Sequence, residues 1–162
     1  MLAALERMSR SEDWVERVRA ARLVARLDPG ASEAIVERLL TDDRTPVAEA
    51  MVTALLHARR ETAIPLVLRT IGRRRAVGQA LLEGLLNSEL DGVDVRGTII
   101  AVLLAAGDRD EIVGALGAIA WLAPSGGFQA PPEAFARVME LSESDEQAVR
   151  VLAAEALVAL AR

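Results

Sequence analysis

Six arginines stand close together near the middle of this chain of 162 residues. We call them the arginine belt; they are Arg59, Arg60, Arg69, Arg73, Arg74 and Arg75, and the chain's one histidine, His57, comes shortly before them. A guanidinium group forms paired hydrogen bonds with a carboxylate or a phosphate. The belt is therefore a candidate binding site for an acidic protein segment, a phosphate or a nucleic acid. The alternative is ordinary solvated charge, because the dipole favours arginine at the carboxyl end of a helix.

The expected helix over residues 61–71 divides the belt into two groups. A helix of that length spans roughly 16 Å, so we expect Arg59 and Arg60 to lie on the opposite edge from Arg73–Arg75. The second group leads into another expected helix, where positive charge opposes the dipole. An unfavourable placement of this kind indicates a use for Arg73–Arg75 beyond stability.

The second candidate site is the segment 121–132, which reads WLAPSGGFQAPP. Loops are where proteins commonly place recognition residues, and Trp121 and Phe128 are half of the chain's large aromatic residues. Phe128 follows two glycines, which is not a core pattern, so both aromatic residues are candidates for contact with a partner. The alternatives are that Phe128 folds back over the adjacent helices and that Trp121, like Trp14, packs in the core.

The sequence lacks the residue types and spacings that most catalytic and metal sites need. The chain has no cysteine, which excludes disulfides, thiol catalysis and cysteine metal sites. His57 alone would leave a zinc site dependent on carboxylates, and no serine stands in a recognisable nucleophile elbow. The acidic clusters lack the spacing of a calcium loop and are expected to cap helices. We therefore expect no catalytic residue, no metal and no cofactor.

The elements that carry these residues are expected to be helices. The chain is 52% hydrophobic and only 2% aromatic, and it is rich in alanine and leucine, which are strong helix formers. Its length fits one domain over residues 1–162. All the basic residues are arginine, which indicates a GC-rich genome. The composition predicts an all-α fold with closely packed helices.

The net charge of −5 argues against a general nucleic-acid-binding protein. The charge is uneven: residues 57–75 carry six arginines against Glu61, and residues 76–162 carry five arginines against thirteen acids. The N-terminal MLAALERM lacks the positive region of a signal peptide. The longest apolar run, Ile99–Ala106, is far too short to span a bilayer. We expect a cytoplasmic protein without a membrane partner.

One pattern occurs near both ends of the chain. The segments 11–27 and 144–160 each begin with serine and acidic residues and continue with apolar and small residues at helical spacing. The matching positions are Ser11 with Ser144, Arg17 with Arg150, Ala20-Ala21 with Ala153-Ala154, and Leu27 with Leu160. Helices that open successive pairs are expected near residues 12, 43, 73, 109 and 144. A period of about thirty to thirty-six residues is typical of repeat architectures.

This repeated sequence pattern resembles the HEAT repeats of phycobilin lyase subunits. The resemblance rests on Asp145-Glu146, Val149-Arg150, Ala153-Ala154 and Leu157. The first repeat departs from the pattern at Glu16-Arg17, and a later one has Ala48 where arginine is usual. The resemblance covers nearly the whole chain, and it implies an α-solenoid of about five antiparallel helix pairs, of the HEAT-like or armadillo type. It also implies binding of other proteins on a concave face formed by the second helices of the pairs.

We therefore expect a non-enzymatic scaffold or adaptor, of a bacterial adaptor or immunity type. The acidic second half of the chain suggests a basic partner. One alternative is a nucleic-acid-binding or DNA-glycosylase-like enzyme, but such enzymes have a basic concave surface, and this chain is acidic with two distant tryptophans. A phycobilin-lyase-like subunit is another alternative, although aromatic residues for a pigment cleft are scarce. The last helix has no polar cap after it, and an apolar outer face there would pair with a second copy or with further sequence.

Overall fold

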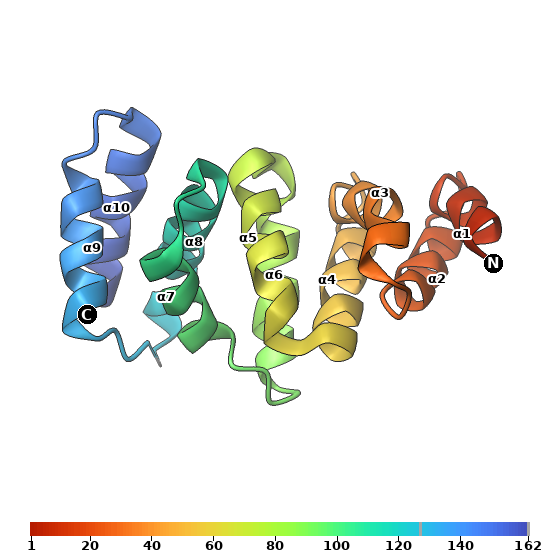
Figure 1. Ribbon diagram of the computed structural model, residues 1–162, viewed down its shortest axis with the longest axis horizontal. Helices are drawn as coiled ribbons and strands as arrows, with labels where there is room; N and C mark the ends of the chain where they lie inside the picture. The colour runs from red at the N-terminus through yellow and green to blue at the C-terminus, as the bar shows by residue number, and fades with distance from the viewer. Residues whose placement is uncertain (127, 162) are drawn as a thin grey trace. The chain divides into compact units, whose positions relative to one another are not determined.

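The computed structural model describes residues 1–126 and 128–161 and contains no β-strand in these ranges (Figure 1). The α-helices are α1 (Leu2–Ser9), α2 (Trp14–Val24), α3 (Pro29–Leu40), α4 (Thr45–Arg59), α5 (Ile64–Arg73), α6 (Gly78–Glu89), α7 (Val95–Ala105), α8 (Arg109–Leu122), α9 (Pro132–Ser142) and α10 (Gln147–Leu160). Short 3₁₀ segments are η1 (Arg60–Ala63), η2 (Arg75–Val77) and η3 (Ala123–Ser125). The prediction of an all-α fold is confirmed, and the solenoid stays a prediction.

Aspartates begin several of these helices. Asp13 accepts a hydrogen bond from the backbone N–H of Val15 at 2.9 Å at the start of α2, and Asp108 accepts one from the N–H of Asp110 at 2.7 Å at the start of α8. Such N-caps satisfy backbone donors that have no partner within the helix. The main difference from the expected starts is α6, which begins at Gly78 rather than near Arg73, because α5 continues through Arg73 and η2 follows it.

The chain divides into two compact units whose sequences are interleaved. Unit 1 comprises Met1–Ala63 and Arg74–Val93, and unit 2 comprises Ile64–Arg73 and residues from Asp94 onward. The helix α5 thus belongs with the second half of the chain, whereas α6 belongs with the first. The prediction of a single domain over 1–162 stays a prediction.

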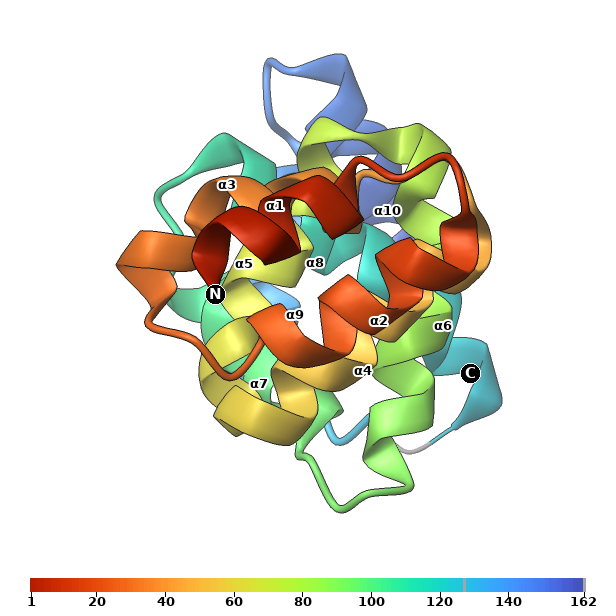
Figure 2. The same cartoon turned by 90° about the vertical axis from the view of Figure 1, so that its right-hand side faces the viewer.

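In unit 1, α2 packs against α4 and α4 packs against α6, while α1 and α3 lie against α2 (Figure 2). The core of this unit is formed by aliphatic side chains with no exposed surface. They include Val24, Leu39, Leu40, Met51, Leu55 and Leu81. Because these positions recur at helical spacing, each helix presents one apolar face to its neighbours.

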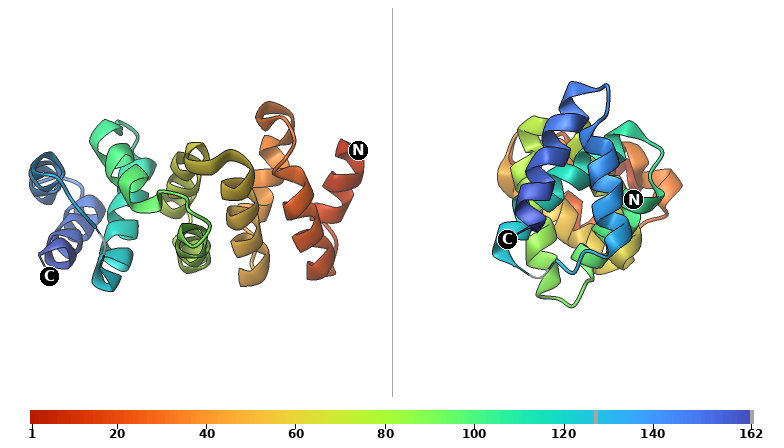
Figure 3. Two further views of the ribbon diagram at one scale, coloured as in Figure 1. Left: turned by 90° about the horizontal axis from the view of Figure 1, so that it is seen from below. Right: turned by 90° about the vertical axis from the view of Figure 1, so that its left-hand side faces the viewer.

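In unit 2, α5 packs against α8, and α8 packs against α10, which also lies beside α9 (Figure 3). The approach of α5 to α8 is close, because a Cβ atom on Gly114 would stand 1.9 Å from the carbonyl oxygen of Leu68. A Cβ atom on Gly72 would stand 2.0 Å from the carbonyl oxygen of Asp110. The two glycines therefore allow the two helix backbones to meet directly.

The repeat seen in the sequence has a counterpart in atomic contacts. Arg17 donates from Nη1 to the carbonyl oxygens of Ser11 at 2.7 Å and Glu12 at 3.3 Å. Arg150 donates from Nη1 to the carbonyl oxygens at the matching positions, 144 at 2.7 Å and 145 at 3.2 Å. Each arginine thus holds the turn before its own helix, which explains why the two segments share their arginine. The shared serines accept through Oγ from the backbone N–H of Asp13 and Glu146, each at 3.2 Å.

Candidate functional site

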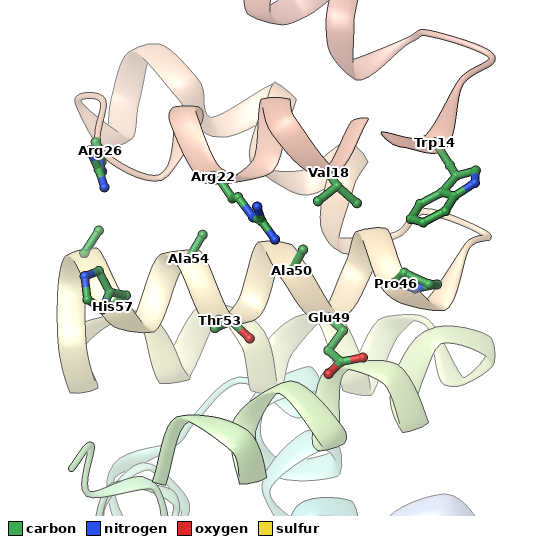
Figure 4. Close-up of a pocket in the computed structure, with 11 residues that line it drawn as sticks. Trp14, Val18, Arg22, Arg26, Pro46, Glu49, Ala50, Thr53, Ala54 and His57 are labelled. Carbon is green, nitrogen blue, oxygen red and sulfur yellow. The ribbon is translucent and has the colours of Figure 1, made fainter. Parts of the chain in front are cut away.

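A groove of about 870 Å³ lies between α2 and α4 in unit 1 (Figure 4). We call it the α2–α4 groove. It is lined by Trp14, Val18, Arg22, Arg26, Pro46, Glu49, Ala50, Thr53, Ala54, His57 and Ala58.

Helical spacing explains how these residues come to line one groove. The α2 side is a row at intervals of four residues, Trp14, Val18 and Arg22, and Arg26 follows it in the turn after the end of α2 at Val24. The α4 side has a matching row, Pro46, Ala50, Ala54 and Ala58. Residues four apart lie above one another on a helix surface. Three of the α4 residues end at a methyl group, so the space beside the longer α2 side chains stays open.

One end of the groove is apolar. Trp14 stands in the first turn of α2 and Pro46 in the first turn of α4, and the two side chains lie at the same end of the groove (Figure 4). Trp14 is 43% exposed, so the prediction that it packs in the core is wrong. The alanine-lined wall of α4 does not cover an indole ring, and Trp14 therefore presents an aromatic face to solvent.

The other end of the groove is basic. Arg26 and His57 lie there, with Arg22 between them and the apolar end (Figure 4). Neither Arg22 nor Arg26 forms a hydrogen bond or an ion pair through its side chain with any residue the structure describes. The acid in the lining, Glu49, instead accepts a hydrogen bond from Asn87 of α6 at 2.8 Å. The groove therefore offers two guanidinium groups that are available to a carboxylate.

The backbone contributes little to the α2–α4 groove. Both walls are α-helices, whose N–H and C=O groups are bonded within the helix. Recognition here must come from side chains, namely apolar contact at Trp14 and charge at Arg22 and Arg26. Such an arrangement can bind a ligand that is apolar at one end and anionic at the other.

The arginine belt is divided between the two units. Arg59 in unit 1 donates to the carbonyl oxygen of Leu27 at 3.2 Å. Arg60 donates to the carbonyl oxygen of Gly92 at 2.8 Å, and it has a φ of 52°, which is unfavourable for a residue other than glycine. Arg60 therefore ties the end of α4 to the turn after α6.

The belt residues of unit 2 face carboxylates at the start of α8. Arg69 pairs with Glu111, and Nε of Arg73 lies 2.8 Å from Oδ2 of Asp110. The hydrogen bond from Arg73, aided by one from Arg109 and opposed by burial, holds the pKa of Asp110 below its ordinary value. The hydrogen bond to Glu146 is the main cause that raises the pKa of Arg109. These ion pairs tie α5 to α8 and α8 to α10.

Arg74 and Arg75 differ from the rest of the belt. Both side chains are exposed, and neither forms a hydrogen bond or an ion pair with a described residue. The structure thus leaves two members of the belt available to a ligand, whereas the other four contact acceptors of the protein itself. The use of the belt in binding stays a prediction.

The aromatic residues of the segment 121–132 lie in unit 2. Trp121 is 40% exposed near the end of α8, so the alternative that it packs in the core is wrong. Phe128 is half-buried, with the guanidinium carbon of Arg96 5.1 Å from its ring centre. Arg96 also donates to the carbonyl oxygen of Leu122 at 3.1 Å and to Oγ of Ser125 at 3.1 Å. Arg96 therefore links Phe128 to the end of α8 and to η3, and contact of Trp121 or Phe128 with a partner stays a prediction.

The α2–α4 groove was not among the sites expected from the sequence. The signal for it is present, because an aromatic residue, an aliphatic residue and two arginines recur every four residues from Trp14 to Arg26. The matching row of α4 consists mainly of alanines, whose short side chains leave space beside the α2 row. Only the fold reveals that these two rows face each other. Sequence reasoning considered clusters of charge and missed a row that mixes apolar and basic residues.

Two further properties concern only residues 1–126 and 128–161. Within these ranges no three His, Asp or Glu side chains are arranged to hold a metal ion. No helix there is both long and apolar enough to cross a membrane.

No protein-family model, curated protein or solved structure matches this chain.

Proposed function

We propose that this chain is a non-enzymatic protein-binding module, a solenoid of HEAT-like helix pairs, and that its α2–α4 groove holds a helical segment of a partner protein. The observation that carries the proposal is the groove itself, with an exposed tryptophan at one end and two arginines that have no side-chain partner among the residues the structure describes. An amphipathic helix laid in an apolar groove is a recurring mode of peptide recognition. This mode of recognition suits the α2–α4 groove, because it uses side chains and the backbone groups of the groove walls are already bonded.

The spacing along α2 defines the partner segment. Trp14 and Arg22 are eight residues apart, which corresponds to about 12 Å along the helix axis. A partner helix aligned with the groove would carry an aliphatic or aromatic anchor on Trp14 and Pro46 and a carboxylate seven or eight residues away. A second carboxylate one turn further would reach Arg26. Tryptophan and arginine are also the residue types that dominate binding energy at protein interfaces.

The local charge favours an acidic partner segment over the basic partner expected from the acidic second half of the chain. Charges on a surface are screened over about 8 Å at physiological salt, so the charged residues of the groove lining act most strongly on a bound segment. Arg22 and Arg26 outnumber Glu49, the acid of the groove lining, and the Glu49 carboxylate accepts a hydrogen bond from Asn87 of α6. The nucleic-acid alternative is less favoured, because Arg69 and Arg73 of the belt already face carboxylates.

The proposal is tested with a designed peptide and the full chain. The probe is a fluorescein-labelled helical peptide of about sixteen residues, with leucine as anchor and glutamates seven, eight and eleven positions later. We expect it to bind the wild-type chain, and we expect Arg22→Gln with Arg26→Gln to weaken binding about tenfold or more. Ala54→Trp should abolish binding because the indole fills the groove. The measurement is fluorescence anisotropy, with circular dichroism to confirm that each variant is folded.

Two matched controls make the experiment decisive. Arg74→Gln with Arg75→Gln removes two unpaired arginines of the same unit, and Ala136→Trp adds an indole to an exposed position of α9. Both variants should bind the peptide as the wild type does. A loss of affinity in the belt variant, with none in the groove variant, would contradict the proposal and assign binding to the arginine belt.

A further inference from the structure

The matching helices α2 and α10 differ in what covers one row of side chains. On α2 the row is Arg17, Ala21 and Ala25; on α10 the same positions are Arg150, Ala154 and Val158. Ala21 and Ala25 are buried, at 0% and 2% exposure, whereas Ala154 is exposed and Val158 is 57% exposed. The adjoining Val151 is 49% exposed, although Val18 at the matching position of α2 is partly covered. One row is thus an interface and the other is open.

The acidic turn before α4 pairs with the arginine that begins the α2 row. Nε of Arg17 lies 2.8 Å from Oδ2 of Asp42, and Nη2 reaches Oδ1 of Asp42 at 3.2 Å and Asp43 at 3.7 Å. Asp42 is 7% exposed and the Arg17 side chain 13% exposed. The pair therefore closes over the junction at which α4 meets α2.

Arg150 has only half of this arrangement. Its Nη1 donates to the carbonyl oxygens of Ser144 and Asp145, as Nη1 of Arg17 does to its own turn. Its Nε and Nη2 have no acceptor in the described part of the chain, whereas those of Arg17 contact aspartates. The guanidinium is thus held in place with its carboxylate-binding edge open, next to an exposed apolar row.

We infer that the α10 row binds a helix of a different protein that is preceded by an acidic turn, packed as α4 is packed on α2. The carboxylates would occupy the open edge of Arg150, as Asp42 occupies that of Arg17. The apolar face of the same helix would cover Ala154 and Val158 and partly cover Val151. This surface lies in unit 2 and shares no residue with the α2–α4 groove, so the inference does not rest on the proposed function.

The chain itself supplies the probe, a fluorescein-labelled peptide of residues 41–60, which contains the acidic turn and α4. We expect this peptide to bind the full-length chain in an anisotropy titration. Arg150→Gln should weaken binding about fivefold, as expected for loss of one ion pair. Val158→Asp should weaken it at least tenfold, because it places a charge in the apolar contact. A peptide with Asp42→Asn and Asp43→Asn should bind about fivefold more weakly and show no further loss with Arg150→Gln.

The controls are Arg7→Gln and Leu90→Asp, which make the same kinds of change at exposed positions elsewhere. Both should leave peptide binding unchanged. The inference is overturned if the peptide does not bind, or if it binds wild type and Arg150→Gln equally. It is also overturned if sedimentation shows a dimer of the chain that Val158→Asp dissociates, because the occupant would then be a second copy.

Discussion

At the scale of single residues, the close contact between α5 and α8 depends on two glycines, which have no Cβ atom. Gly114 and Gly72 face the backbone carbonyl oxygens of Leu68 and Asp110, where an added Cβ atom would overlap. We expect Gly114→Ala to lower the free energy of unfolding by about 1–3 kcal/mol, because overpacking outweighs the gain in helix propensity. Urea unfolding followed by circular dichroism measures this change.

The same helix offers a matched control. An added Cβ atom on Gly117 has nothing within 4 Å, so Gly117→Ala should keep only the propensity gain and stabilise the protein by about 0.5–1 kcal/mol. Equal effects of the two substitutions would show that α5 and α8 do not approach through Gly114.

The two matching arginines give a second prediction at this scale. Arg17 and Arg150 make the same contacts with their own turns, but Arg17 also pairs with the buried Asp42. Arg17→Gln should therefore cost about 2–3 kcal/mol of stability, and Arg150→Gln less than about 1 kcal/mol. A double-mutant cycle with Asp42→Asn should assign most of the difference to the ion pair. Equal costs for the two arginines would contradict this account.

At the scale of elements, the start of α8 joins its neighbours through charge, and this makes its contribution dependent on pH. The pKa of Asp110 is lowered in the folded state, mainly by the hydrogen bond from Arg73. Its stabilisation is therefore complete above the unfolded value of about 4 and is lost as the pH falls through the lower folded value. We expect Asp110→Asn to cost about 0.5–1 kcal/mol at pH 7.

Urea unfolding of wild type and Asp110→Asn over a series of pH values checks this prediction. The difference between the two proteins should shrink below about pH 4 and vanish once Asp110 is protonated in both states. A difference that stays constant down to pH 2 would show that the Asp110 carboxylate charge contributes nothing to the stability difference.

Element positions were largely predictable because local chemistry sets them. Asp13 and Asp108 cap α2 and α8 where the sequence indicates, and Pro46 lies in the first turn of α4. The start of α6 was not predictable, because α5 continues through Arg73, where its last turn pairs with Asp110. That contact joins residues far apart in sequence, and the spacing of apolar residues within a helix does not predict such a contact.

The candidate site was less predictable than the elements for a related reason. The arginine belt is conspicuous in the sequence, yet Arg59, Arg60, Arg69 and Arg73 contact acceptors of the protein itself. The α2–α4 groove arises only when two rows from different helices face each other, and its depth depends on alanine methyl groups. The sequence pattern of each helix shows its own row of side chains but does not show that the two rows face each other.

At the scale of the whole molecule, the two units are interleaved along the chain. Unit 1 lacks α5, although its sequence runs on both sides of that helix, and α5 packs on α8 of unit 2. A fragment of residues 1–93 therefore keeps α5 but loses the helix that covers it. We expect the amides of residues 64–73 to exchange at least tenfold faster in this fragment than in the full chain, with α2 and α4 still protected.

Hydrogen exchange read by mass spectrometry makes this comparison, and circular dichroism shows that the fragment retains helix. A fragment of residues 1–106, which still lacks α8, should behave in the same way. Full protection of residues 64–73 in either fragment would show that α5 does not depend on α8.

For the whole molecule, we propose that a partner helix binds in the α2–α4 groove. The chain's two tryptophans, Trp14 in the groove and Trp121 in unit 2, allow a direct test. The full chain labelled with 5-fluorotryptophan is titrated with the acidic helical peptide and followed by ¹⁹F NMR, and Trp14→Phe assigns the two resonances. We predict that the Trp14 resonance shifts in a saturable way while that of Trp121 stays in place. A shift of Trp121 alone, or no shift at a peptide concentration that saturates anisotropy, would contradict the account.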